Sequence, residues 1–363
     1  MARRVEQVSI RAEDIVDLLG GTGRELRRAV PFAFDACWFT IDPSTLLITG
    51  HYNAHLDGDA DLRRTVNVGL AVNEYQETDV NKFADLATRR RPAATLHEAT
   101  NDDLGRSPRY RRLLRPLGAE AELRVAIRDG WSCWAGVALY RPPGEPDFDQ
   151  AEIELVLSVT RSIARGVRRA LLLGDLDAAD PATAPGLVLF DERGEVEAAT
   201  PAAERWLEQL VDPQPGRGGG IPHVVYAVAA RSRAEPDGTV GARTRVPTRS
   251  GGWLILHGSR LGEGDRRTAV IIEPALPLEV APLKLQAYGL TPRELEVADR
   301  VLLGETTEQI ATALFIAPYT VQDHLKSIFA KLGVKSRREL VNHLAARGLG
   351  AETPPSPPVR PQT

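Results

Sequence analysis

The stretch from residue 316 to residue 342 reads IAPYTVQDHLKSIFAKLGVKSRRELVN, and it decides how the C-terminal part of the chain folds. Pro318 suits the first turn of a helix, and apolar residues then recur at helical spacing up to Gly333, which suits a helix end. Ser336 and Glu339 form a capping box for a further helix. The stretch therefore predicts two consecutive short helices.

Two more helices are expected just upstream. Thr291 and Glu294 form a capping box before an apolar stripe that Gly304 ends, and Thr306 with Gln309 starts the next helix in the same way. The second and third of these four helices are joined by a few residues, which is the spacing of a helix-turn-helix. We therefore expect one small all-α domain built from four short helices.

The positive charge of the chain gathers in this part. The formal net charge of the 363 residues is -4, yet residues 331–338 contain four cations and no anion. Residues 284–349 hold nine Lys or Arg against seven Asp or Glu, whereas residues 1–283 hold 35 against 41. An acidic body thus carries a weakly basic module, although composition alone is equally consistent with a few solvated surface lysines.

Residues 289–340, GLTPRELEVADRVLLGETTEQIATALFIAPYTVQDHLKSIFAKLGVKSRREL, resemble the LuxR-type helix-turn-helix along their full length. The resemblance implies that the third helix enters the major groove and that Gln322, Asp323 and Lys326 face the bases. The commonest family pattern has a basic residue where Gln322 stands. We therefore expect an altered base preference here, with DNA binding retained.

The chemistry of these side chains suits base readout, because Gln can bond adenine, Lys can donate to guanine and Asp can accept from cytosine. Neighbouring polar and basic residues are expected to contact phosphates, whereas His324 is expected to pack against its own module. The full set expected to contact DNA is Thr306, Tyr319, Thr320, Gln322, Asp323, Lys326, Ser327, Lys331, Lys335 and Arg337.

Residues 1–176 read as an α+β domain. A helical start is followed by strand-like runs, and capping residues Asp149 and Glu152 open an expected single helix of about 25 residues up to Gly174. This order of elements resembles the GAF sensory fold, and SPRYRRLLRPLGAEAELRVAI (107–127) is similar to its counterpart in LuxR-type regulators. The runs expected as strands are 36–42, 46–52, 122–130 and 131–141.

Residues 181–275 form a second expected α+β unit, which resembles a PAS domain. A strand pair around DERG is followed by a helix from Thr200 and by three strand-like runs. Residues 211–220 are expected to form a loop. The expected fold class is therefore multi-domain: a GAF-like domain (1–176), a PAS-like domain (181–275), a linker (276–288), an all-α LuxR-type helix-turn-helix domain (289–350) and a disordered tail (351–363).

The segment that leads into and forms the linker contains prolines at 274, 277 and 282, which remove backbone donors, so residues 274–283 are not expected to form one continuous helix. It is therefore expected to be jointed, without one continuous helix. Leu283, Leu285 and Tyr288 supply apolar surface that could dock this joint on a sensor domain. From this we expect the sensor domains to inhibit DNA binding; the alternative is a passive linker, with sensors that only promote dimerisation.

Other chemistries lack sequence support. No zinc-protease HExxH, P-loop or G-x-S-x-G elbow is present, so neither catalysis nor a cofactor is expected. Cys37 and Cys133 read as buried inert thiols, and His51 and His55 are not expected to form a metal site. No apolar run approaches the roughly 18 residues of a membrane helix, and the N-terminus lacks a signal sequence, which predicts a cytoplasmic protein.

The sequence thus predicts a cytoplasmic one-component transcription regulator that binds double-stranded DNA as a homodimer. An unknown small molecule could bind the GAF-like or PAS-like domain. Two alternatives stay open: an enzyme or nucleotide-responsive module fused to a helix-turn-helix, and sensor-like domains that serve only as a dimerisation scaffold. The fourth helix of the module and the helix expected at 149–173 are the two candidate dimer surfaces.

Overall fold

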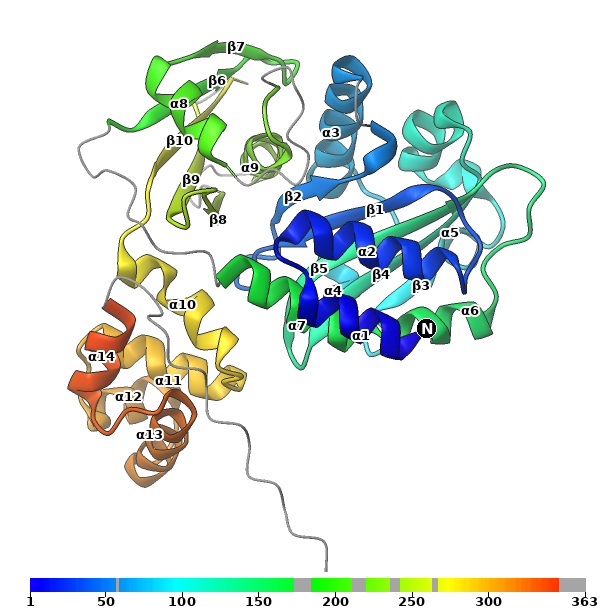
Figure 1. Cartoon of the computed structure of the whole chain (residues 1–363). Coiled ribbons are helices and arrows are strands. Elements are labelled where there is room, and N and C mark those ends of the chain that lie inside the picture. The colour runs from blue at the N-terminus through cyan, green and yellow to red at the C-terminus, as the bar shows by residue number, and fades with distance from the viewer. Residues whose placement is uncertain (57–58, 173–183, 211–219, 236–241, 263–266, 346–363) are drawn as a thin grey trace, which may run out of the picture.

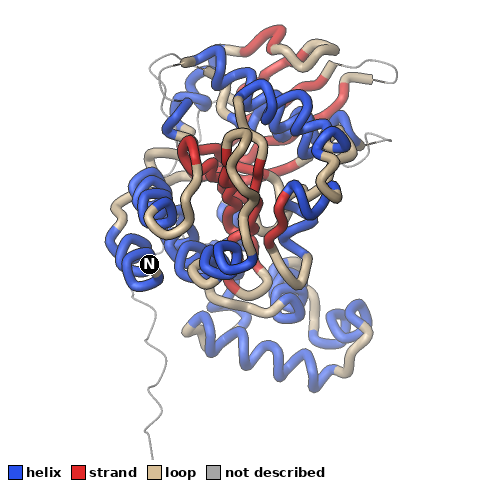
Figure 2. The backbone as a smooth tube through the Cα atoms, turned by 90° about the vertical axis from the view of Figure 1, so that its right-hand side faces the viewer, coloured by secondary structure: helices blue, strands red, loops and turns tan. Residues whose placement is uncertain are grey.

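The computed structural model describes the chain except residues 57–58, 173–183, 211–219, 236–241, 263–266 and 346–363. It contains two α+β sheet domains followed by an all-α module, which confirms the expected fold class (Figure 1). In Figure 2 the strands occupy the upper and middle parts, and the lowest part holds only helices and loops. Among the described helices, none combines the length and apolar character that a membrane span needs.

The first sheet domain is a five-stranded antiparallel sheet with helices on both faces. Its strand order is β2-β1-β5-β4-β3. Helices α1, α2 and α7 pack on one face, and α3 and α4 lie over the other. Its elements are α1 (Ala2–Arg11), α2 (Ile15–Arg27), β1 (Ala33–Ile41), β2 (Ile48–Tyr52), η1 (Ala54–Leu56), α3 (Ala60–Tyr75), α4 (Phe83–Thr88), β3 (Ala93–Thr95), α5 (Leu96–Thr100), η2 (Leu104–Arg106), η3 (Tyr110–Leu114), η4 (Arg115–Leu117), β4 (Ala121–Asp129), β5 (Ser132–Arg141), α6 (Gln150–Leu157) and α7 (Thr160–Leu172).

The prediction of one helix over residues 149–173 is wrong. The Asp149–Glu152 capping box is present, but α6 ends at Leu157 and α7 begins at Thr160. At the break, the hydroxyls of Ser158 and Thr160 donate to backbone carbonyls, a local bond that competes with helix continuation. The apolar stripe on both helices is buried in the core of its own domain. It is therefore not an exposed coiled-coil seam, and this candidate dimer surface is withdrawn.

The second sheet domain repeats the same strand order, because β7-β6-β10-β9-β8 is again second, first, fifth, fourth and third along the chain. Two helices accompany this sheet. Helix α9 has nine of its twelve residues buried, since it lies between its own sheet and α3 and β2 of the first domain. The elements are β6 (Gly186–Phe190), β7 (Val196–Ala199), α8 (Pro201–Gln209), α9 (His223–Ala234), β8 (Arg243–Pro247), β9 (Trp253–Arg260) and β10 (Thr268–Pro274).

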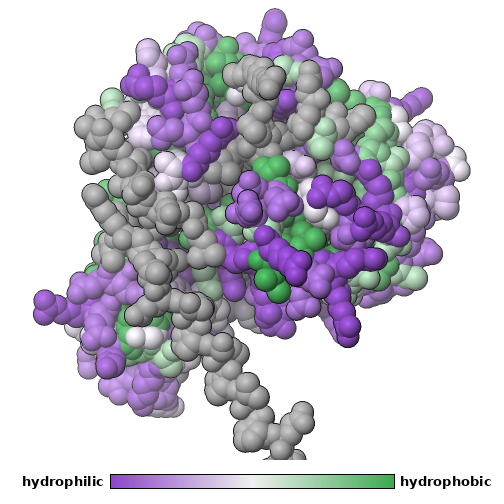
Figure 3. Space-filling view, in the orientation of Figure 1, coloured by the Kyte–Doolittle hydropathy of each residue, from purple (hydrophilic) through white to green (hydrophobic). Residues whose placement is uncertain are grey.

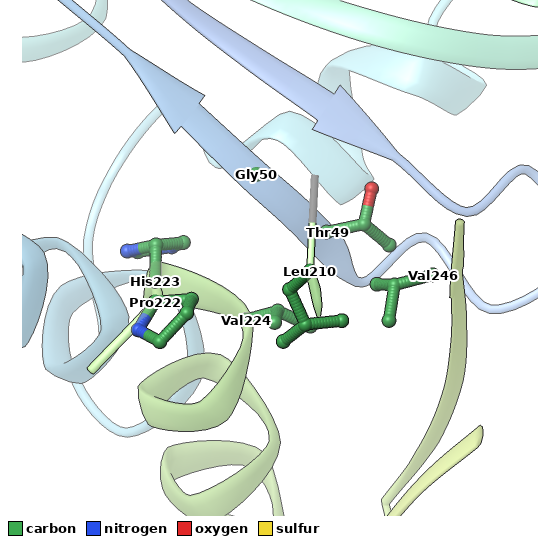
Figure 4. Close-up of a pocket in the computed structure, with 7 residues that line it drawn as sticks. All are labelled: Thr49, Gly50, Leu210, Pro222, His223, Val224 and Val246. Carbon is green, nitrogen blue, oxygen red and sulfur yellow. The ribbon is translucent and has the colours of Figure 1, made fainter. Parts of the chain in front are cut away.

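The two sheet domains meet at a pair of buried imidazoles. His51 of β2 contacts Cys37 Sγ at 2.9 Å and Asn67 Oδ1 at 2.8 Å, and its ring lies 5.8 Å from the ring of His223 on α9. Figure 4 shows Pro222, His223 and Val224 at the start of α9 on one side, and Thr49 and Gly50 of β2 on the other, of a cavity too small to admit a ligand. Burial lowers the pKa of His51 to about 4 and that of His223 to about 3. Both rings are therefore neutral near pH 7.

The two cysteines behave as expected. Cys37 and Cys133 are buried and unpaired, and burial raises the pKa of each thiol to about 12. A neutral thiol is a poor nucleophile and a poor metal ligand. Among the described residues, no group of His, Cys, Asp and Glu has the arrangement of a metal site.

Arg245 of β8 joins the two sheet domains to the helix that leads to the C-terminal module. Its backbone N and Nη1 each lie 3.3 Å from Oδ2 of the fully buried Asp42, and Nη1 also donates to Ser44 Oγ at 2.8 Å. Its Nε donates to the backbone carbonyl of Glu279 in helix α10 (Pro277–Ala287). One guanidinium thus holds the β1–β2 turn, β8 and α10 together.

The expected jointed linker is instead largely a helix, α10 (Pro277–Ala287), which corrects the sequence prediction. Pro282 removes only the bond to the carbonyl of Leu278, which lies on an exposed part of the helix. Val280 and Leu283 pack with the first domain, whereas Ala281 and Leu285 lie in the core of the module. Tertiary packing on both sides thus outweighs the helix-breaking tendency of proline.

The module contains the four expected helices, α11 (Pro292–Leu302), α12 (Thr307–Leu314), α13 (Pro318–Leu332) and α14 (Arg337–Ala345). The capping boxes at Thr291 and Thr306 are both formed, and Gly333 ends α13 in the left-handed conformation. Residues 211–219 of the loop expected at 211–220, and the tail expected at 351–363, lie outside the described residues.

We predict that acidification weakens the contact between the sheet domains. Each histidine has a folded-state pKa below its unfolded value of about 6.5, so its contribution is complete above pH 6.5 and is lost as the pH falls toward 4. His223→Phe should leave urea stability at pH 7 intact and reduce the loss between pH 7 and 4.5 by about 2 kcal/mol. Tyr226→Phe, a change on the same helix at a side chain whose pKa burial raises above its usual value of 10, should retain the wild-type pH profile between pH 7 and 4.5; equal profiles for both variants would contradict the assignment.

A second prediction concerns the Arg245–Asp42 pair. Arg245→Met leaves a buried carboxylate without its cation and should lower the free energy of unfolding by about 3 kcal/mol. Asp42→Asn combined with Arg245→Met should cost at least about 1 kcal/mol less than the sum of the single changes, because the two residues act as a unit. Strictly additive costs in urea unfolding of the full chain would show that the pair carries no coupling.

Candidate DNA-binding site

Helix α13 presents one apolar face to the module and one polar face to solvent. Val321, Leu325 and Ile328 are buried against α11 and α12, so the residues between them face outward. Figure 1 shows α13 at the lower edge of the molecule, with the rest of the module between it and the sheets. Figure 3 shows mainly hydrophilic residues on the visible surface of the module. The helix-turn-helix geometry of α12 and α13 is therefore formed with its second helix open to solvent.

The three residues expected to face bases lie together on this open face. Gln322, Asp323 and Lys326 are exposed, and Lys326 Nζ lies 3.2 Å from Asp323 Oδ1. This exposed pair is weak, since both side chains are more than two-thirds accessible to solvent. The Lys326–Asp323 contact can therefore break, and each side chain can bond to a base edge instead. Tyr319 is 71% exposed one turn earlier, and Thr320 beside it is partly buried.

Lys331 and Ser327 are placed differently from the expectation. Lys331 Nζ contacts Glu294 Oε2 at 2.6 Å and the carbonyl of Gly289 at 3.2 Å, while Ser327 Oγ donates to Glu294 Oε1 at 2.5 Å. Burial acts to raise the pKa of Glu294, but the bonds from Lys331 and Ser327 hold it at about 2. In this structure both residues fasten α13 to the first turn of α11, and neither points to a separate partner.

The remaining expected contacts surround the helix starts. Arg337 donates from Nη1 to the Glu305 carbonyl at 2.7 Å and from Nη2 to Thr307 Oγ1 at 2.9 Å, which ties α14 to the α11–α12 connection. Thr306 caps α12 through Gln309. Lys335 is exposed. These residues frame the module, whereas only Tyr319, Gln322, Asp323 and Lys326 form a continuous outward face on α13.

One exposed aromatic residue near this face was missed by sequence reasoning. Phe315 ends α12 with φ of 53° and has 94% of its surface exposed. The left-handed residue that ends a helix is usually glycine or asparagine, so a phenylalanine at position 315 does not indicate a helix end there. Because the backbone turns at Phe315, its ring is directed away from the module's core.

The family model described as bacterial regulatory proteins of the luxR family matches residues 289–344. Spore germination protein GerE of Bacillus subtilis is 42% identical over 59 residues, which are 16% of this chain and 80% of that protein. The transcriptional activator RamA of Corynebacterium glutamicum is 31% identical over 133 residues, 34% of this chain and 46% of RamA.

Three mycobacterial relatives named HTH-type transcriptional regulators are 48% identical over 60 residues, but the chain spans only 7% of their length. Among solved structures, a VqmA–ligand–DNA complex from Vibrio cholerae matches 48% of this chain and 87% of that chain with 19% identity and a TM-score of 0.25. Bacteriophytochrome RpBphP3 of R. palustris matches 75% of this chain and 61% of that chain, with 12% identity and a TM-score of 0.26. Scores this low do not establish a shared fold.

We predict that Lys331 contributes to the stability of the module. Lys331→Met keeps most of the aliphatic stem but leaves the Glu294 carboxylate without its cation, so the module should lose about 1–3 kcal/mol of stability. Lys335→Met, an exposed cation four residues away, is the matched control and should unfold like wild type. Equal thermal unfolding of the two variants would show that the Glu294 contact is dispensable.

Proposed function

The chain belongs to the luxR family of bacterial regulatory proteins, and from that membership we infer that it regulates transcription by sequence-specific binding to double-stranded DNA. The observation that carries this proposal is the open polar face of α13 within the matched module. Gln322, Asp323 and Lys326 supply the donor and acceptor groups that base edges in the major groove require. Tyr319, Thr320 and Lys335 would contact phosphates from the same side.

Two expected phosphate contacts have a reduced part in this proposal. The Lys331 and Arg337 side chains are bonded within the module. They would therefore attract DNA through long-range electrostatics more than through direct hydrogen bonds to phosphates. Ser327 and Thr306 likewise satisfy partners of their own. The proposed DNA contacts are therefore concentrated in the first two turns of α13.

The two sheet domains are proposed to act as GAF-like and PAS-like sensors. Both are five-stranded antiparallel sheets with one strand order, and helices precede and follow the first sheet. Their influence would reach the module through α10, because this helix packs on the first domain and on the module at once. The expectation that the sensor domains inhibit DNA binding stays a prediction. Because the proposed base-facing residues of α13 are exposed, such inhibition would act through the placement of the module in a dimer.

A homodimer is also proposed, because one such module makes few base contacts and two-fold pairing extends the site. Of the two surfaces considered, the stripe on α6 and α7 is buried, which leaves the outer side of α14. Arg338, Glu339 and Asn342 are exposed there, and Val341 is partly buried beside them. Both terminal modules would then present α13 to successive turns of one duplex.

We predict that Gln322 sets the preference at one base pair. Gln322→Ala should cost about 1–3 kcal/mol with the preferred duplex and relax selection at a single position in a randomised-sequence experiment. Thr312→Ala, an exposed change on α12, should select the wild-type site. If the Gln322 variant recovered an unchanged site, the assigned face of α13 would be wrong.

A further inference from the structure

A cleft of about 300 Å³ opens where the two sheet domains meet beside α3. Helix α3 provides one wall, the η3 turn provides the other, and Glu195 reaches in from the start of β7. Small-molecule sites commonly lie in such clefts between domains and have this volume. Residues important to its chemistry are Arg64, Val68, Val72, Arg112, Leu113 and Glu195.

The rim of the cleft carries both signs of charge. Arg64 Nη1 lies 2.5 Å from Glu195 Oε2, an ion pair that crosses from the first sheet domain to the second. Arg112 pairs with Glu77 on the opposite side. Both arginines are more than half exposed, so these rim pairs contribute little to stability and exchange readily for a ligand. The rim therefore offers two guanidinium groups and two carboxylates.

The floor of the cleft is apolar. Val68, Val72 and Leu113 line it, and a Cβ built at Gly69 of α3 would be in ordinary van der Waals contact with Leu113, 3.5 Å away, so a side chain added there meets no clash. Arg109 also borders the cleft, but its guanidinium is buried and bonded to Glu122 and Asn73. Arg109 is thus part of the wall of the cleft, and only the rim residues are available to bind the charged groups of a ligand.

The wall that holds Arg112 is fixed in place. Residues Tyr110–Leu114 form a π-helical turn, a rare geometry that is frequent at functional sites. The segment before it is anchored by Asp79, which accepts from Ser107 Oγ and from the Arg109 backbone N, each at 2.9 Å. Arginine 112 is therefore presented from a rigid support, and a bound ligand would lose little affinity to ordering of the backbone.

We propose that this cleft binds an α-amino acid with an apolar side chain. The carboxylate would accept two parallel bonds from an arginine of the rim, the ammonium would donate to a rim glutamate, and the side chain would cover the apolar floor. A simple anion would leave the glutamates without a cation, and a simple amine would leave the arginines without an anion. A zwitterion satisfies both signs.

The site deepens the proposed sensor function and rests on it for its regulatory meaning. A ligand ammonium on Glu195 competes with Arg64, and the Arg64–Glu195 pair spans the two sheet domains. Binding would thus replace a direct contact between the domains by a contact through the ligand. The chemistry of the cleft itself requires no DNA.

Titration calorimetry of the full chain with L-leucine, 4-methylpentanoate and 3-methylbutylamine tests the proposal. The three probes share one branched apolar group, while the second lacks the ammonium and the third lacks the carboxylate. We expect leucine to bind and each analogue to bind at least about tenfold more weakly. Equal affinity for an analogue, or no heat from leucine at about 10 mM, overturns the proposal.

Variants locate the binding. Gly69→Leu fills the cleft from α3 while favouring the helix, and Arg112→Gln removes one rim cation; each should weaken leucine binding at least about tenfold. Arg205→Gln, an exposed arginine on α8, is the matched control and should bind as wild type. Unchanged affinity in both cleft variants would place leucine elsewhere and contradict the assignment. Since no DNA is present, failure here leaves the DNA-binding proposal intact.

Discussion

The guanidinium of Arg245 is the contact on which the arrangement of the three parts depends. Asp42 is fully buried in the β1–β2 turn, and a buried carboxylate is tolerated only where cations and donors surround it. Arg245 supplies that cation from the second sheet domain, and it simultaneously bonds the Glu279 carbonyl of α10. A displacement of either sheet domain therefore changes the hydrogen bonds available to the helix that leads to the module.

Helix α10 carries this dependence into the module. Tyr288, just after α10, lies 3.0 Å from His343 Nε2 through its hydroxyl, and Lys284 Nζ lies 3.4 Å from the Leu344 carbonyl. Both contacts end on α14, the helix whose outer side we propose for dimerisation. The sheet domains would therefore set the relative placement of two modules without covering their reading faces. A fragment that begins at residue 284 would divide α10, so an isolated module has to begin before Pro277.

The sequence was most informative where local chemistry decides the structure. Capping residues at Thr291 and Thr306 and the glycine at 333 marked the helices of the module, because a cap depends on only a few neighbouring residues. Helix α9 was missed because it is buried on nearly all sides and has no polar face to create a helical period. Helix α3 was missed because polar residues, Asn67 and Asn73, occupy buried positions on it. These residues interrupt the apolar period that would indicate a helix.

Long-range partners explain the other differences. The prolines around α10 argued against a helix, and only packing on two domains reverses that preference. Lys331 was expected to contact a phosphate from its position in the motif. In the structure its ammonium pairs with the carboxylate of Glu294, which lies 37 residues away along the chain. The exposure of Gln322, Asp323 and Lys326 follows from helical phase, which places them away from the buried Val321 and Leu325. Their contact with bases is implied by the LuxR-type resemblance and stays a prediction. Contacts across domains leave no comparable pattern in one sequence.

Amide hydrogen exchange of the full chain can show whether α13 reads DNA from an open face while α10 stays docked. A duplex recovered by selection from a random library would serve as the partner. We expect slower exchange in the α12–α13 turn and the first half of α13 on addition of duplex, in a protein whose α10 is already protected without DNA. Unchanged exchange in α13, or an unprotected α10 before DNA is added, would contradict this mechanism.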